Sequence, residues 1–351
     1  MKACPEDAVN VSMGQAWLVW LMAGLALASG AVGLLWVDQS LPHAGLWLLI
    51  SFSVTVGFAH GALDVWLLLV RFQPFVHASR LGLAYLLLVL LLGGLLSFAV
   101  PVALLLLILT SLWHFGEDYA RWSAMPAKAR LLTRLVVGGA PVMAPLLIKP
   151  AGMAALFSYW PVLADAVPVW QFMAWFWLAL VIVWAIRWGW QHLQASRFVW
   201  LELGAVLLLN LAFSPLMAFA LYFGLYHAPV HIWRVWRLWR AWHSQKPGGK
   251  SAIASNAASN AVRSLGSTSA LAVLAAMVSI SLVLGSGLWW LLSQQLNYLI
   301  FPADLGAALS MALPWLIVAL AAVTLPHLIL ISCCTAWLSG DSKPCRTNSI
   351  D

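Results

Sequence analysis

The segment RLGLAYLLLVLLLGGLLSFAVPVALLLLILTSLWHFGEDYA, residues 80–120, sets the fold class. It contains no Asp, Glu, Lys or Arg between Arg80 and Glu117. A helix needs roughly 20 mostly apolar residues to cross about 30 Å of hydrocarbon, so two spans fit, 80–100 and 101–120. The whole chain agrees, because 63% of its 351 residues are hydrophobic and 8% are charged. We therefore predict an all-α, polytopic membrane helical bundle and exclude a soluble, disordered or disulfide-stapled chain.

Working outward from this segment, the same criterion predicts about ten transmembrane helices. The other eight spans are 16–37, 45–70, 131–148, 168–190, 199–213, 215–234, 269–293 and 305–332. Glycines together with Pro141 and Pro145 are expected to break the span 131–148, and the span 199–213 is short. The apolar stretch 151–164 is expected to be a surface or re-entrant piece.

The basic residues predict the orientation of the bundle. Of the 18 Lys and Arg residues, all but Lys149 fall at the N-terminus or after an even-numbered span. Because Lys and Arg concentrate in cytoplasmic loops, both termini are predicted to be cytoplasmic in a multi-pass protein of the cell (inner) membrane. This surface accounts for the net charge of +7, so no nucleic-acid partner is expected.

The chain is predicted to form one integral-membrane helical domain, 1–340, followed by a cytoplasmic tail, 341–351. Within the domain, residues 244–268 are rich in Ser, Ala, Gly and Asn, which is typical of a flexible cytoplasmic loop. Cys4 and Cys345 would lie in reducing cytoplasm, so neither a disulfide nor a cysteine metal site is expected.

Five histidines fall inside predicted spans: His60, His114, His227, His231 and His327. Ionisable groups within hydrocarbon are costly and generally face the interior of the bundle. The five residues occupy the second, fourth, eighth and tenth spans, which all run from outside to cytoplasm, and each lies in the half nearer the cytoplasm. Side chains at a shared depth on four helices can converge on one point, as ligands do in the metal sites of helical bundles.

The pair in the eighth span carries the strongest local signal. His227 and His231 are four residues apart in YFGLYHAPVHIWR, so both imidazoles project from one helical face. Pro229 lies between them and cannot donate a backbone hydrogen bond, which frees the carbonyl of Leu225 and is expected to kink the helix.

Nearby acids are candidates for fixing the orientation of the ligand rings. Asp64 follows His60 by four residues, and Glu117 follows His114 by three. Either carboxylate can accept the second ring N–H of a ligand histidine, or it can serve only as a helix-packing or interfacial group. Glu202, near the predicted start of the span 199–213, is expected to be interfacial.

The set of imidazoles suits Fe, Cu, Ni or Zn. With octahedral iron, four imidazoles leave two positions for O₂ and a nearby substrate, and the chain lacks the repeated HxxHH boxes of a di-iron site. The residues by themselves lead to a mononuclear metal enzyme acting on an apolar, lipid-soluble substrate. His327 stays open between ligand, indirect support of a ligand and substrate contact.

Four ordered motifs, HGALD at 60–64, WHFGED at 113–118, YHAPVHIWR at 226–234 and TLPH at 324–327, resemble those of the Brp/Blh family. The resemblance implies a membrane β-carotene 15,15′-dioxygenase, which splits the central double bond with O₂ to give two molecules of all-trans-retinal. It implies Fe(2+) as cofactor, with β-carotene or a similar carotenoid, O₂ and membrane lipid as partners. The iron ligands that it implies are His60, His114, His227 and His231.

Two other functions are kept as alternatives. A transporter could use the buried histidines as a relay, but it would need a water-filled path and more paired carboxylates. A non-catalytic relative could assist the biogenesis of a retinal protein, since family membership does not guarantee activity. Most of the 23 Trp residues are expected to be interfacial anchors. Trp113, Tyr222 and Tyr226 are candidates for flanking the polyene, and core packing is the expected role for each.

Overall fold

The computed structural model describes residues 75–122, 126–158, 165–233 and 317–330, together with the single positions 24 and 28. Throughout these ranges the regular structure is helical and contains no strand, so the all-α prediction is confirmed for them. Most of the predicted spans 16–37, 45–70 and 269–293, the loop 244–268 and the tail 341–351 lie outside the described residues. The count of ten spans and the single-domain division therefore stay predictions.

Each predicted span that falls on described residues is helical there. The first helices are α4 (Phe75–Ser97), α5 (Val100–Trp122), α6 (Ala127–Ile148) and the short α7 (Pro150–Phe157). They are followed by α9 (Val167–Trp184), the π-helical turn η2 (Ala185–Gly189) and α10 (Leu193–Ala212). The next helix begins as α11 (Pro215–Leu221), widens into the π-helical turn η3 (Tyr222–His227) and continues as α-helix to residue 233, and a last helix covers Ile317–Leu330.

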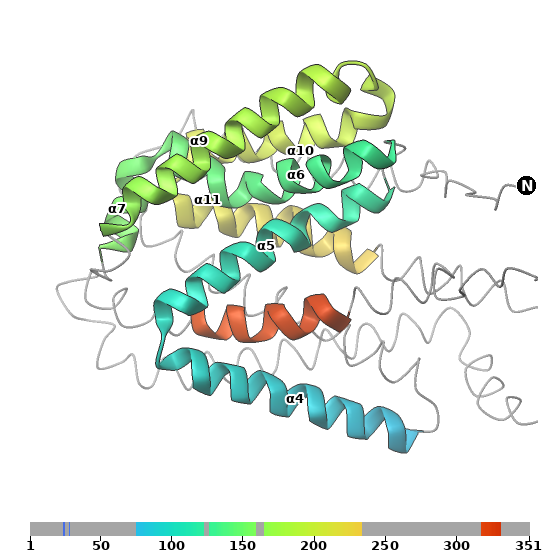
Figure 1. Ribbon diagram of the computed structural model, residues 1–351, viewed down its shortest axis with the longest axis vertical. Helices are drawn as coiled ribbons and strands as arrows, with labels where there is room; N and C mark the ends of the chain where they lie inside the picture. Colours follow the sequence, from blue (N-terminus) through green and yellow to red (C-terminus); the bar gives the residue numbers. More distant parts are fainter. Residues whose placement is uncertain are drawn as a thin grey trace, which may run out of the picture.

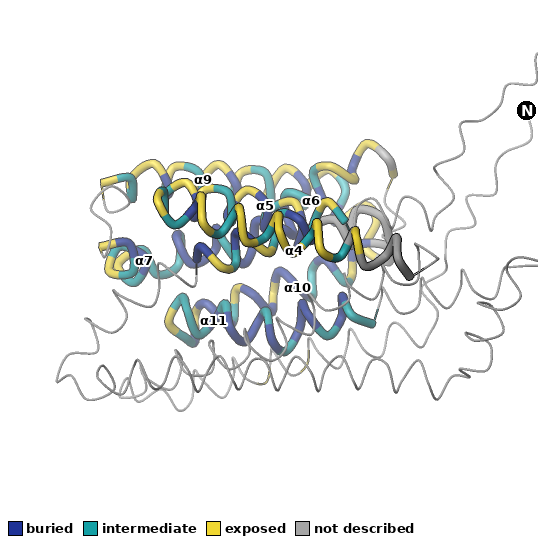
Figure 2. The backbone as a smooth tube through the Cα atoms, turned by 90° about the horizontal axis from the view of Figure 1, so that it is seen from below, coloured by how far each residue is buried: buried dark blue, intermediate teal, exposed yellow. Residues whose placement is uncertain are grey.

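Within the described ranges, two helices, Lys128–Ile148 and Val167–Gly189, are long and apolar enough to cross a membrane. They differ in their surroundings: α6 packs against α5, α9 and α10, whereas much of α9 faces outward. The outward face of α9 is apolar, with Phe172 72% and Trp175 63% exposed. Figure 2 shows many exposed residues along α4 and α9 and more buried residues along α10 and α11. An apolar outer face is what contact with lipid requires.

The expected break in the fifth span is wrong, because α6 runs unbroken through Pro141 and Pro145. Each proline removes one backbone hydrogen bond, but neighbouring helices surround this part of α6 and can satisfy the freed carbonyls. The glycines in the same stretch serve contacts between helices. At Gly138 an added Cβ would overlap the carbonyl of Leu112 in α5, and at Gly139 it would overlap the indole of Trp177 in α9.

The seventh span is longer than expected, and this changes the position of Glu202. Because α10 begins at Leu193, Glu202 lies in the middle of the helix and is only 1% exposed. The expectation that Glu202 is interfacial is therefore wrong. Charged and polar residues such as Arg197 at the start of α10 lower the local hydropathy, so the sequence criterion places the start of this helix too late.

The expected surface or re-entrant piece at 151–164 begins as the helix α7, which buries Met153 and Phe157. Residues 159–164 lie outside the described residues. Just before α7, the Lys149 ammonium donates a hydrogen bond to the carbonyl of Phe213 at 2.7 Å and so ties this corner to the end of α10. Burial lowers the pKa of Lys149.

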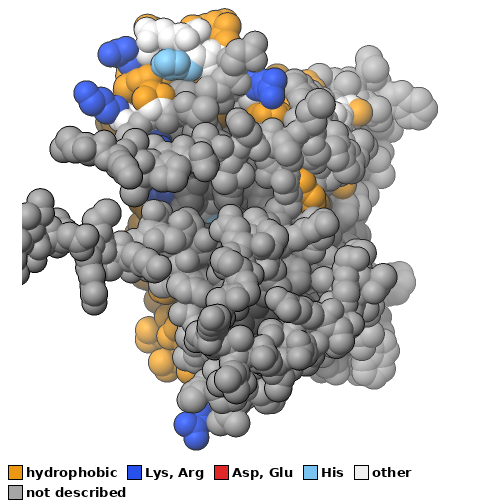
Figure 3. Space-filling model, turned by 90° about the vertical axis from the view of Figure 1, so that its right-hand side faces the viewer, with side chains coloured by type: hydrophobic (Ala, Val, Ile, Leu, Met, Phe, Trp, Pro, Cys, Tyr) orange, Lys and Arg blue, Asp and Glu red, His pale blue; other side chains and the backbone are white. Residues whose placement is uncertain are grey.

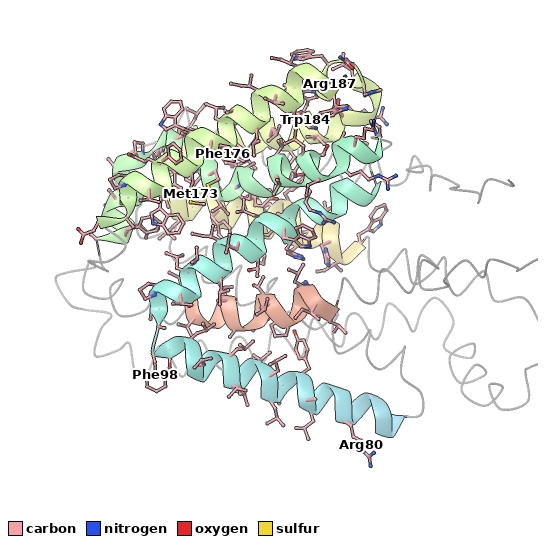
Figure 4. All side chains as sticks on the ribbon, viewed as in Figure 1. Arg80, Phe98, Met173, Phe176, Trp184 and Arg187 are labelled. Atoms are coloured by element: carbon pink, nitrogen blue, oxygen red, sulfur yellow. The ribbon has the colours of Figure 1, made fainter. Side chains whose placement is uncertain are left out.

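The two ends of the helices differ in their charged side chains. Arg80 and Arg187 lie at one end and Phe98 at the other (Figure 4). Figure 3 looks onto the first end and shows Lys and Arg side chains, with no Asp or Glu visible among the side chains described there. This is the one-sided distribution expected from the loop charges, although the orientation in a membrane stays a prediction.

Candidate metal centre

Three separate helices bring four histidines together. His114 comes from the second half of α5, His227 and His231 come from η3 and the turn after it, and His327 comes from the end of Ile317–Leu330. Figure 1 shows α5 running between the α11 helix and the orange-red helix of residues 317–330. All four side chains are buried, with 2–5% of each exposed.

The rings lie within contact distance of one another. His114 is central: its ring centroid is 5.1 Å from that of His227, 5.3 Å from that of His231 and 5.0 Å from that of His327. His231 lies 5.9 Å from His227 and 5.7 Å from His327, again between centroids. The Nε2 atoms of His114 and His227 are 3.3 Å apart.

These separations fit imidazoles gathered around one ion. Nitrogen ligands at about 2.1 Å from a metal lie roughly 3.0–3.4 Å from each other, and their ring centroids lie roughly 4.5–6 Å apart. In the part of the chain that the structure describes, no three His, Cys, Asp or Glu side chains stand in full metal-holding geometry. The donors themselves are of the kind that transition metals take, since imidazole nitrogen suits Fe, Cu, Ni and Zn.

The other sequence-predicted site residues are not placed. His60 and Asp64 lie outside the described residues. Glu117 lies on α5, and the position of its side chain is likewise outside what the structure describes. The structure thus brings His327 together with three of the four histidines implied by the family resemblance, and their set of ligands stays a prediction.

Close packing against α6 positions His114. An added Cβ at Gly116 would overlap the carbonyl of Arg134, and one at Gly138 would overlap that of Leu112. Leu112 and Gly116 lie two residues before and two residues after His114. The backbone of α5 therefore rests directly on the backbone of α6 on both sides of the residue that carries the central ring.

A widened turn positions the other pair of rings. In η3 the amide of Ala228 donates to the carbonyl of Phe223, five residues back, which is the π-helical pattern. Sequence reasoning predicted a kink at Pro229, and the structure has a π turn immediately before it. Such turns insert one extra residue into a helix and often occur at functional sites.

Aromatic rings also lie close to His227. The centroid of Phe115 lies 4.5 Å from that of His227, and those of Phe223 and Tyr222 lie 6.0 Å and 6.1 Å away. Trp113 instead is 41% exposed and lies beneath the Arg134 guanidinium, 3.8 Å from its ring centroid. Core packing is therefore right for Tyr222, whereas Trp113 lies at the outer surface of α5.

Sequence reasoning missed one feature next to this centre. The buried Glu202 carboxylate accepts hydrogen bonds from the hydroxyls of Tyr222 at 2.6 Å and Tyr226 at 3.2 Å. The available signal was an acidic residue within an apolar span, which by default indicates function. The predicted span 199–213 begins only three residues before Glu202, so hydropathy alone indicates an interfacial position.

The fold and the histidine cluster define a class: an all-helical protein whose apolar helices enclose a candidate metal centre. Comparison with protein families makes this specific. The chain belongs to the beta-carotene 15,15′-dioxygenase family, whose model matches residues 51–335. The match contains all four motifs and confirms the resemblance to the Brp/Blh family. Comparison with curated proteins and with solved structures gave no match.

Proposed function

We propose that this protein is an Fe(2+)-dependent membrane dioxygenase that cleaves β-carotene at its central 15,15′ double bond with O₂ and releases two molecules of all-trans-retinal. In this reaction one C=C bond is broken and two C=O bonds are formed, so the two oxygen atoms of O₂ balance the two aldehydes. The observation that carries the proposal is the cluster of four buried histidines in a chain of this family.

The proposed iron ligands are His60, His114, His227 and His231. Three of them are among the clustered rings, and His327 lies in the same cluster, 5.0 Å from His114 between centroids. Bound iron would supply the binding and reduction of O₂. Neutral imidazoles suit this purpose because they hold the ion without cancelling its charge.

The remaining work belongs to the chain. Its apolar helices would keep water away from the centre and accept a polyene directly from the lipid. Phe115 and Phe223 flank His227 and present apolar rings against which a rigid polyene can be held. Positioning the central double bond is the main contribution that the protein can make, since a fixed geometry replaces a costly encounter.

The histidine-relay transporter receives less support. Among the described residues, the buried acidic side chain is Glu202, and its two oxygens are engaged by tyrosine hydroxyls. A relay needs several carboxylates along a path, whereas the Glu202 carboxyl group is hydrogen-bonded to two tyrosines of one helix. A cell-membrane, multi-pass location is part of the proposal and follows from the apolar helices and from the basic residues at one end.

The deciding experiment is expression of the full chain in bacteria that accumulate β-carotene, with metal analysis of the protein purified in detergent. We expect the orange colour to fade, retinal to appear in the extract, and about one iron per chain to copurify. An unchanged carotenoid content with iron bound would support the non-catalytic relative instead. Carotenoid loss that yields products other than retinal would overturn the assignment of the central bond.

A further inference from the structure

Glu202 stands out because a carboxyl group in the middle of an apolar helix needs compensation. It lies in α10 with 1% of its surface exposed, and the residues around it in the sequence, FVWLELGAVLLL at 198–209, are otherwise apolar. Burial of an acidic group is costly unless hydrogen bonds compensate for it. The partners of Glu202 therefore show what the side chain can do.

Both oxygens of this carboxyl group are directed at one short segment. The Tyr222 hydroxyl donates to Oε1 at 2.6 Å, and the Tyr226 hydroxyl donates to Oε2 at 3.2 Å. Both tyrosines are 2% exposed. The bond from Tyr222 is in the range of strong O–H···O hydrogen bonds, and the bond from Tyr226 is longer and weaker. Together they connect one carboxyl group of α10 to two points of this segment.

The two tyrosines bracket the π turn that leads to the histidine pair. Tyr222 is the first residue of η3, and Tyr226 immediately precedes His227. The ring of Tyr222 also stacks on that of His227, with centroids 6.1 Å apart and an interplanar angle of 26°. The direction in which His227 and His231 project therefore depends on how this turn is wound.

An α-helical winding of η3 would direct the histidine pair elsewhere. A π turn contains one residue more than the corresponding α turn, and one residue of an α-helix corresponds to about 100° of rotation. Rewinding η3 as ordinary α-helix would turn His227 and His231 by about this angle relative to Tyr222. The bonds from α10 to both ends of the turn oppose this rotation.

We propose that Glu202 is a positioning residue for the histidine centre. Its carboxyl group holds Tyr222 and Tyr226 against α10, keeps η3 in its π-helical form, and so directs His227 and His231 at the shared point. Glu202 acts through the helix and is not itself a ligand. The inference rests on the proposed function, since it assumes that the histidines bind a metal ion.

The test uses Co²⁺ as a probe in the full-length protein purified in detergent without metal. The visible absorption of Co²⁺ reports the number and arrangement of its ligands, and titration gives its Kd. We expect Glu202→Gln to weaken Co²⁺ binding by about tenfold and to change the shape of the absorption bands, as loss of the support behind a metal ligand generally does. Tyr222→Phe and Tyr226→Phe should produce the same change in smaller measure.

Asn210→Leu is the matched control. Asn210 lies on the same helix and is buried, but its amide donates to the carbonyl of Val206 within α10 rather than to η3. This variant should retain the wild-type Kd and spectrum. If Glu202→Gln does not accumulate, Tyr226→Phe decides the matter, because it removes only a hydroxyl group.

Wild-type Kd and spectrum in both Glu202→Gln and Tyr226→Phe would overturn the inference while leaving the proposed function intact. Failure of the wild-type protein itself to bind Co²⁺ or iron would overturn the proposed function, and the positioning role with it. Equal weakening by Asn210→Leu would show a general loss of helix packing and would also contradict the proposal.

Discussion

The contact between α6 and α9 and the histidine centre are both polar regions enclosed by apolar helices, yet they are built differently. Between α6 and α9, each donor meets one acceptor: the Trp177 indole donates to the carbonyl of Val136 at 3.1 Å, and the Trp184 indole donates to the hydroxyl of Thr133 at 2.9 Å. At the histidine centre, four groups of one kind converge.

This is the difference expected between polar groups that join two helices and polar groups that bind an ion. A hydrogen bond between two helices needs one donor and one acceptor, and the two buried tryptophans supply the donors for such pairs. Gathering imidazoles from three helices is unnecessary for that purpose, whereas it is what an ion bound by several nitrogens requires. Trp177 and Trp184, 5% and 0% exposed, are also not the interfacial anchors that the sequence suggests for most tryptophans.

The largest effect on the histidine centre is expected from the removal of one of its rings. We expect His231→Ala to lower iron retention and retinal formation by about two orders of magnitude or more, since loss of a ligand should cost more than loss of its support. Iron analysis and chromatography of retinal from membranes of matched protein content measure both quantities. Full activity in a variant that inserts normally would remove His231 from the site.

A change at His327 tests whether the histidines of the cluster differ in their roles. It lies beside His114 and His231 but is not among the ligands implied by the family resemblance. We expect His327→Ala to weaken iron binding by about tenfold, which is the range for a group that supports a ligand. An equilibrium titration against a chelator gives the affinity. A loss as large as that in His231→Ala would instead identify His327 as a ligand.

The smallest effect on the histidine centre is expected from a change at the contact between α6 and α9. Trp184→Phe removes the indole donor, while the Thr133 hydroxyl keeps its own bond to the carbonyl of Ala129 at 2.9 Å. The expected cost is at least about 1 kcal/mol of stability, from the lost hydrogen bond and from the gap that the smaller ring leaves, with iron content and retinal yield unchanged. Thermal unfolding in detergent measures the first quantity. A loss of iron in this variant would show that the two regions are not independent.

The sequence predicted the helices of the described part and the shared depth of their histidines, because both depend on distance along the chain. An apolar run gives the length of a helix, and the place of His114 or His327 within that run gives its depth. The match of residues 51–335 to the family was likewise accessible from ordered motifs.

What the sequence did not predict depends on contacts across helices. The continuity of α6 through Pro141 depends on the helices packed around it. The role of Glu202 depends on the rotation of α10 relative to η3, which brings Tyr222 and Tyr226 within hydrogen-bond distance. Neither relation has a signature in local hydropathy or spacing, so burial and partners emerge only with the assembled helices.

The glycine contacts between α5 and α6 make the position of His114 independent of the side chains packed around it. Gly116 and Gly138 let main-chain carbonyls, rather than flexible side chains, set the separation of the two helices. Because main-chain atoms cannot change rotamer, we expect exchange of the surrounding leucines and valines to leave this separation largely unchanged. The two helices therefore form one rigid unit. The ring of His114 has a fixed position in this unit, and the histidine rings on the other helices are placed around it.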